Sequence, residues 1–176
     1  MQLDPVFMWI ISLCLSMLFM FAALHKVKYT AHFEMVLVSY QLLPRKSIFL
    51  ISKLFIMVEV VTSLALIISP GRPMGAVLAF LLLSVYGAAM AINLLKGNRL
   101  LDCGCHLQAQ KQAISWRLVL RNALLAGAAL LLLMPETARR LQVYDLAVVA
   151  FGLTMCVLIY TIASQLNQTH SQLKKG

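Results

Sequence analysis

Five long runs of apolar residues dominate this sequence, and the segments between them carry most of the charged and turn-forming residues. A helix needs about 20 mainly apolar residues to cross the roughly 30 Å of hydrocarbon in a bilayer. We therefore expect an all-α membrane protein, a polytopic bundle of four to five transmembrane helices in a single integral membrane domain, residues 1–176. The expected spans cover about residues 5–24, 47–69, 74–95, 117–134 and 143–164.

Composition excludes the main alternatives to a membrane protein. Hydrophobic residues make up 61% of the chain and charged residues 12%, whereas a soluble domain usually has about 45–50% and about 25%. The net charge of +9 would suit a nucleic-acid partner, but the basic residues are spread thinly between the apolar runs. Basic residues in such positions orient a membrane protein. The expected partner is the lipid bilayer, and no nucleic acid is expected.

The ends of the apolar runs carry helix-start and turn signals. Pro5 suits the first position of a helix, and Pro70-Gly71-Arg72-Pro73 forms a compact break between the second and third runs. A signal peptide begins with basic residues and has a short apolar core. No basic residue precedes the first run, and the run is about 20 residues long, so neither feature fits a signal peptide. The first run is therefore expected to be a retained membrane helix.

Two connections are long enough to have a structure of their own. Residues 26–46 mix apolar and basic side chains, a pattern typical of an interfacial helix that lies on the membrane. Residues 96–116 are polar and hold two cysteines, and we call them the redox loop.

The distribution of Lys and Arg predicts an orientation. The two long connections and the C-terminal tail share one side, which holds twelve basic residues when helix ends are included. The other side holds three, Arg72, Arg139 and Arg140. Because cytoplasmic loops collect Lys and Arg, the first side, with the redox loop, is expected to be cytoplasmic and the N-terminus to lie outside.

The redox loop contains Cys103-Gly104-Cys105, followed by His106. A Cys-x-Cys pair closes a disulfide only in a tight ring, since its two Cα atoms lie near the upper limit of the allowed separation. A strained, exposed disulfide is the more oxidising kind, suited to accepting electrons or passing on a disulfide. We favour a redox-active dithiol over two other readings. These are a metal site, for which Cys103, Cys105 and His106 supply three ligands but no clear fourth, and two inert loop cysteines.

The remaining cysteines and one acidic residue lie inside apolar runs. Cys14 and Cys156 are expected to be structural. Glu59 sits in the middle of the second run, where a carboxyl group is expensive and usually faces a partner inside the bundle. It is expected either to be protonated or to reach His25 or Lys26 at the end of the first run. A structural hydrogen bond and a proton-handling role both fit. His25, Lys26 and Glu59 are the supporting candidates beside the cysteine pair.

Taken in order, these landmarks resemble the MauE family of methylamine-utilisation membrane proteins, which is related to the DoxX-like membrane proteins. The resemblance covers about residues 10–160 and is carried by His25-Lys26, Phe33, Tyr40-Gln41-Leu42-Leu43-Pro44, Glu59, Asp102-Cys103-Gly104-Cys105 and Arg121-Asn122.

The resemblance implies a part in the processing, transport or maturation of methylamine dehydrogenase. The small subunit of that enzyme is rich in disulfides, and a thioredoxin-like protein, MauD, is the expected partner. The chain would then be an accessory factor of the bacterial inner membrane that does not itself oxidise methylamine. A periplasmic substrate favours cysteines on the periplasmic side, whereas the charge distribution favours the cytoplasmic side.

Two other functions fit the same residues. One is a non-catalytic membrane scaffold for the thioredoxin-like partner, and the other is a general DoxX-like membrane oxidoreductase linked to quinone. The sequence has no glycine-rich phosphate loop and no haem-attachment motif. A membrane quinone near Glu59 and the loop cysteines is therefore the one cofactor considered, and no metal is expected.

Overall fold

The structure, a computed structural model, describes residues 3–40, 44–97, 114–137 and 142–173. Every regular element in these ranges is a helix. The α-helices are α1 (Pro5–Lys28), α2 (Thr30–Tyr40), α3 (Ile48–Ile67), α4 (Arg72–Leu95), α5 (Trp116–Leu131) and α6 (Val143–Leu173), with short 3-10 turns η1 (Arg45–Ser47) and η2 (Ser69–Gly71).

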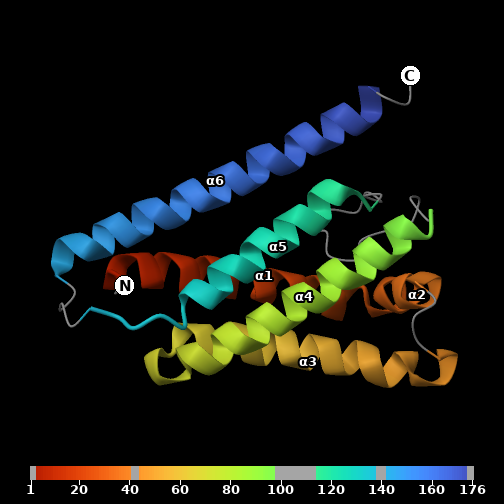
Figure 1. Ribbon diagram of the computed structural model, residues 1–176, viewed down its shortest axis with the longest axis horizontal. Helices are drawn as coiled ribbons and strands as arrows, with labels where there is room; N and C mark the ends of the chain where they lie inside the picture. Colours follow the sequence, from red (N-terminus) through yellow and green to blue (C-terminus); the bar gives the residue numbers. More distant parts are fainter. Residues whose placement is uncertain (1–2, 41–43, 98–113, 138–141, 174–176) are drawn as a thin grey trace.

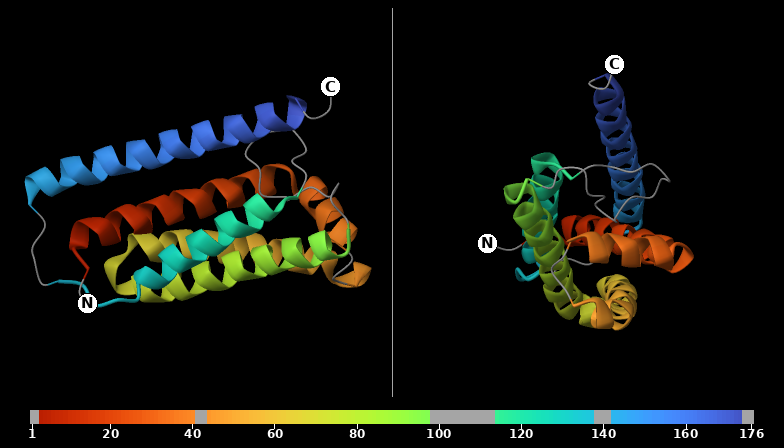
Figure 2. Two further views of the ribbon diagram at one scale, coloured as in Figure 1. Left: turned by 45° about the horizontal axis from the view of Figure 1, so that its top comes forward. Right: turned by 90° about the vertical axis from the view of Figure 1, so that its right-hand side faces the viewer.

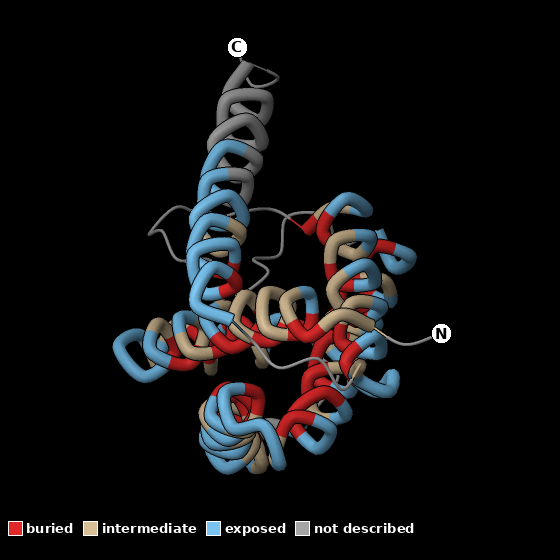
Figure 3. The backbone as a smooth tube through the Cα atoms, turned by 90° about the vertical axis from the view of Figure 1, so that its left-hand side faces the viewer, coloured by how far each residue is buried: buried red, intermediate tan, exposed pale blue. Residues whose placement is uncertain are grey.

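Among the residues that the structure describes, three helical segments are long and apolar enough to cross a membrane: Pro5–Lys28, Ile48–Ile67 and Ser69–Leu95. This confirms the expected all-α membrane bundle. Their outward faces carry exposed large hydrophobic side chains, and the buried residues face the neighbouring helices (Figure 3). A bundle of this kind is stabilised by internal packing, while lipid covers the apolar outer surface.

The helices α1, α3, α4 and α5 form the bundle, and α6 lies along the outside of α1 (Figure 1 and Figure 2). The start of α1, the turn between α3 and α4, the end of α5 and the start of α6 gather at one end (Figure 1). The end of α1, the helix α2 and the end of α4 lie at the other end (Figure 1). Consecutive long helices thus alternate in direction, as repeated membrane crossings require.

Helix starts and turns follow from local chemistry. The carboxylate of Asp4 accepts a hydrogen bond of 2.9 Å from the backbone N–H of Val6, and Pro5 occupies the first helical position of α1. Such a cap satisfies a backbone donor that the helix leaves unpaired. The turn η2 then reverses the chain between α3 and α4.

The helices α3 and α4 approach each other closely just after this turn. A Cβ atom at Gly75 would lie 2.9 Å from the backbone nitrogen of Leu66. Only glycine fits there without movement of the backbone, so the pairing of α3 and α4 depends on that residue.

The fourth and fifth expected spans differ from the helices. The helix α5 ends at Leu131, three residues before the expected end, and the N–H groups of the next three residues bond to the carbonyl three positions back, in a tighter turn. Its 16 residues span about 24 Å at about 1.5 Å per residue. By contrast, α6 runs to Leu173, beyond the expected end at 164. Full crossing by α5 and α6 stays a prediction.

The connection over residues 26–46 contains the short helix α2, and α1 extends into it as far as Lys28. Buried residues of α2 form a small cluster with the end of α4 and the start of α5: Val36, Tyr40, Met90, Leu94, Ile114 and Leu118. The segment is therefore packed against the bundle. Its position at a membrane surface stays a prediction.

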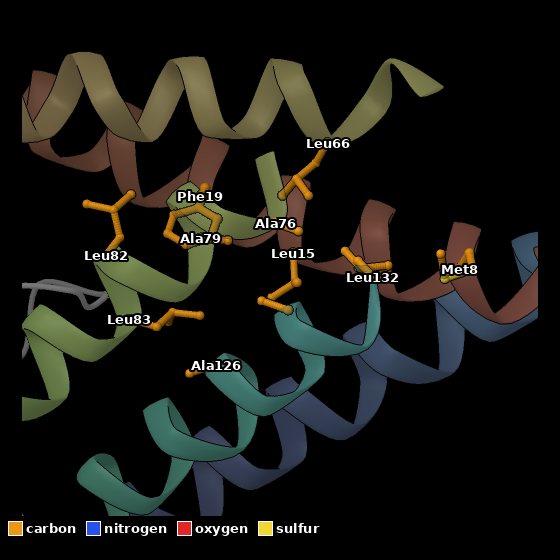
Figure 4. Packing of buried hydrophobic residues seen from close by; sticks show 11 residues of the cluster. Met8, Leu15, Phe19, Leu66, Ala76, Ala79, Leu82, Leu83, Ala126 and Leu132 are labelled. Carbon is orange, nitrogen blue, oxygen red and sulfur yellow. The ribbon is translucent and has the colours of Figure 1, made fainter. Parts of the chain in front are cut away.

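The main core lies between α1, α3, α4 and α5. Figure 4 shows Phe19 and Leu15 of α1 beside small residues of α4 and α5, which let the backbones approach. The cluster contains Met8, Leu15, Phe19, Leu66, Ala76, Ala79, Leu82, Leu83, Ala126, Ala129 and Leu132.

The end of the bundle that holds the N-terminus is tied together by backbone and side-chain contacts. Leu3 donates to the carbonyl of Pro135 at 3.2 Å and accepts from the N–H of Thr137 at 3.0 Å. The guanidinium of Arg72, 4% exposed, lies 4.6 Å from the ring centroid of Trp9 and donates to Glu136 at 3.4 Å. These contacts join the chain after α5 to the start of α1 and α4.

Candidate functional site

Polar side chains line the contact between α1 and α3. Ser16 and Ser63 each donate to the other's backbone carbonyl at 2.9 Å, and Ser12 donates to the carbonyl of Leu66. Small hydroxyl residues let helices approach closely in a membrane and hydrogen-bond across the interface. This contact fixes α1 and α3 side by side, which sets the position of the charged residues farther along them.

One of these charged residues is Lys26, near the end of α1. Its side chain is 1% exposed, and its ammonium group forms an ion pair with Oε1 of Glu59 on α3, which is 0% exposed. Long side chains on a helix lean toward its N-terminus, so Lys26 reaches back from the helix end into the bundle. Of the two partners expected for Glu59, the structure selects Lys26.

Tyr86 of α4 completes the group, and we call Lys26, Glu59 and Tyr86 the buried polar cluster. The ammonium of Lys26 donates to the Tyr86 hydroxyl at 2.8 Å, and that hydroxyl donates to Oε1 of Glu59 at 2.7 Å. Each side chain comes from a different helix. The cluster therefore ties α1, α3 and α4 together through a single carboxylate oxygen.

Aromatic rings surround the ammonium group of the cluster. Its nitrogen lies 4.7 Å from the ring centroid of Phe33 and 4.5 Å from that of Tyr86. Phe55 stacks on Tyr86 with the centroids 5.6 Å apart. A cation over an aromatic face is attracted by the ring, more strongly where water is excluded. These rings replace part of the hydration that Lys26 loses on burial.

The second carboxylate oxygen of Glu59 has a different environment. Oε2 is buried and has no hydrogen-bond partner. A buried carboxylate oxygen without a donor is an available acceptor for a proton or for an incoming N–H or O–H group. Glu59 thus has one oxygen, Oε1, that is held by Lys26 and Tyr86, and a second oxygen, Oε2, that can accept a proton or a hydrogen bond.

The other expected site residues lie elsewhere. The ring of His25 packs against Tyr29, with centroids 4.9 Å apart, and does not join Lys26 at Glu59. The predicted redox pair, Cys103 and Cys105, and the neighbouring His106 lie outside the described residues.

Sequence reasoning missed Tyr86 and the rings around it. Tyr86 sits in an apolar run between small residues, where its hydroxyl, like that of most buried tyrosines, needs a hydrogen-bond partner. The available signal was that the Tyr86 hydroxyl and the Glu59 carboxyl lie at similar depth in consecutive apolar runs, where each could be the hydrogen-bond partner of the other. No such signal marks Phe33 and Phe55, which resemble ordinary packing residues.

Replacing Tyr86 with phenylalanine is expected to lower the free energy of unfolding in detergent by about 1–3 kcal/mol, because a buried hydrogen bond is lost while its partners stay buried. The Lys26–Glu59 pair remains, so the fold should survive. The matched control is Tyr29→Phe, at a side chain that is 45% exposed. Equal denaturation midpoints for the two variants would exclude a stabilising role for the Tyr86 hydroxyl.

Comparison with known proteins identifies the family. The model of "Methylamine utilisation protein MauE" matches residues 4–135. A MauE protein from Paracoccus versutus is 34% identical over 167 residues, covering 93% of this chain and 88% of the relative. One from Paracoccus denitrificans is 36% identical over 128 residues, covering 73% and 69%.

A MauE protein from Methylorubrum extorquens is 44% identical over 103 residues, covering 54% of each chain. No solved structure matches this chain. The family match spans α1 to α5 and thus includes all three helices of the buried polar cluster. The chain belongs to the MauE family of methylamine utilisation proteins.

Proposed function

We propose that this chain is an integral, multi-pass accessory protein of the bacterial inner membrane that serves the maturation of methylamine dehydrogenase. Its task would be thiol–disulfide exchange through Cys103 and Cys105, with a thioredoxin-like protein of the MauD type as partner and the disulfide-rich small subunit as client. The observation that carries the proposal is a Cys-Gly-Cys pair in a polar loop of a membrane protein that belongs to a methylamine-utilisation family.

The proposed exchange balances without a further reagent. The thiolate of one loop cysteine attacks a disulfide sulfur of the partner, and a mixed disulfide forms as one partner thiolate leaves. The second loop cysteine then attacks the mixed disulfide and releases the partner's other thiolate. The loop pair ends as a disulfide and the partner as a dithiol, and the reverse direction transfers the disulfide outward.

The buried polar cluster supports this function by position and chemistry. It fixes α4, the helix that leads into the redox loop, against α1 and α3. The unpartnered Oε2 of Glu59 offers an acceptor for protons released when thiols are oxidised. Lys26 and Glu59 thus remain supporting residues, and a membrane quinone remains the candidate electron carrier.

Replacing Cys103 and Cys105 together with serine is expected to abolish assembly of active dehydrogenase. The measurement is dehydrogenase activity in the periplasm together with the redox state of the small subunit's cysteines. The matched control is Gln108→Ser and Gln110→Ser in the same loop, which changes two polar residues and leaves both thiols. The double serine variant should be present in the membrane in the same amount as wild type, so that a loss of dehydrogenase assembly reports on the thiols.

Normal assembly in the double serine variant would overturn the exchange mechanism and support the scaffold function.

An impermeant thiol reagent applied to spheroplasts tests the side of the membrane on which the pair lies. Labelling from outside supports direct exchange with a periplasmic partner.

A further inference from the structure

The helices α1 and α6 run in the same direction along each other. Both begin at the end of the bundle that holds the N-terminus, and α6 packs against α1 over the first part of its length (Figure 1 and Figure 2). Cys14 and Cys156, which lie 142 positions apart in the sequence, are therefore on neighbouring helices. This pairing brings together residues that the sequence analysis treated separately.

A close contact sets the register of the two helices. A Cβ atom at Gly152 of α6 would lie 2.8 Å from Cδ1 of Ile10 on α1. Residues four positions apart share a helix face. The positions one turn farther along the same faces are Cys14 on α1 and Cys156 on α6. The glycine contact thus aligns the two cysteines.

The two side chains lie close enough to interact. Cys14 and Cys156 are both free thiols and face each other across the contact between α1 and α6. Cys14 is half-buried, whereas Cys156 is exposed on the apolar outside of the bundle, where lipid reaches it. Cys14 lies about 14 Å along α1 from its first residue, at about 1.5 Å per residue. Cys14 therefore lies well inside a helix that is long and apolar enough to cross a membrane.

We propose that Cys14 and Cys156 form a second redox-convertible thiol pair, whose disulfide covalently fixes α6 to α1 within the membrane. Each thiol loses one hydrogen atom, and an S–S bond forms between the two sulfurs. The two electrons and two protons pass to a lipid-soluble oxidant of the quinone class, which becomes the quinol. This pair is separate from Cys103 and Cys105, and its formation does not depend on their function.

The environment determines which oxidant reaches the pair. Water-soluble disulfides react with thiolates, and hydrocarbon strongly disfavours a charged group. A quinone dissolves in the same layer as Cys156 and meets the thiol directly. The resulting disulfide would also resist reduction by aqueous thiols, so that α6 would stay attached once the bond forms.

The test uses the full chain in lipid vesicles, with Cys103 and Cys105 replaced by serine so that two thiols remain. The vesicles are treated with a short-chain benzoquinone, the protein is denatured, and free thiols are counted on a gel with a maleimide-linked polymer. The expected result is loss of both labels from the monomer band and their return after reduction with dithiothreitol. The single variants Cys14→Ser and Cys156→Ser should each keep one label.

A second variant tests the geometry. Gly152→Val places side-chain atoms against Ile10 and is expected to separate the helices and reduce the quinone-induced loss of label. Two labels that persist in the Gly152-containing protein after quinone treatment would overturn the proposal. A disulfide-linked dimer in place of an oxidised monomer would also overturn it, since the bond would then join two chains. Neither result bears on the loop cysteines, which are absent from this background.

Discussion

Replacing Lys26 with methionine is expected to lower the free energy of unfolding by about 3–5 kcal/mol, because loss of one partner leaves a buried charge unpaired. Methionine matches the length of the lysine stem, so the change removes the ammonium group and leaves most of the packing. Glu59, 0% exposed, would then keep only Tyr86 as a hydrogen-bond partner in the cluster. Denaturation of the purified protein in detergent measures the effect.

The matched control is Lys53→Met, which removes an exposed ammonium group from α3. Exposed charges contribute little to stability, so this variant should unfold close to wild type. Equal midpoints for the Lys26 and Lys53 variants would show that the buried pair does not stabilise the bundle. The double variant Lys26→Met, Glu59→Gln should recover much of the loss, because it removes both charges and keeps an oxygen for the Tyr86 hydroxyl.

The fold class could be predicted from the sequence because apolar length is a local property. Each long helix carries its own signal in about 20 consecutive residues, and the three candidate spans lie close to the expected ranges. The end of α5 and the extension of α6 were not predicted. Near helix ends, the local preference of the sequence for helix is weak and competes with tertiary contacts and lipid. Composition alone therefore does not predict at which residue a helix ends.

The site was predicted in part. The cost of a mid-membrane carboxyl pointed to Glu59 and to a basic partner at the end of α1, and the structure provides Lys26. The choice between His25 and Lys26 depends on helix rotation, which sequence spacing alone does not fix across a connection containing α2. Tyr86 and the Cys14–Cys156 contact depend on which helices are neighbours, and that is decided by packing.

Replacing Gly75 with alanine is expected to lower the free energy of unfolding by about 1–3 kcal/mol, the usual cost of overpacking. The new Cβ would meet the backbone nitrogen of Leu66 at 2.9 Å. A backbone atom cannot rotate away as a side chain can, so α3 and α4 have to separate. Gly75→Leu should be worse, and both are measured as denaturation midpoints in detergent.

The control for this substitution is Gly127→Ala on α5, where a Cβ would meet nothing within 4 Å. Alanine is the better helix former, so this variant should be as stable as wild type or more stable. Effects of the same sign and size at Gly75 and Gly127 would contradict the close approach of α3 and α4.

The Gly75 contact lies about 16 Å along α4 from Tyr86, at about 1.5 Å per residue. Since distant sites usually add within about 0.3–0.5 kcal/mol, Gly75→Ala and Tyr86→Phe should be additive. A larger coupling would mean that this contact positions the buried polar cluster.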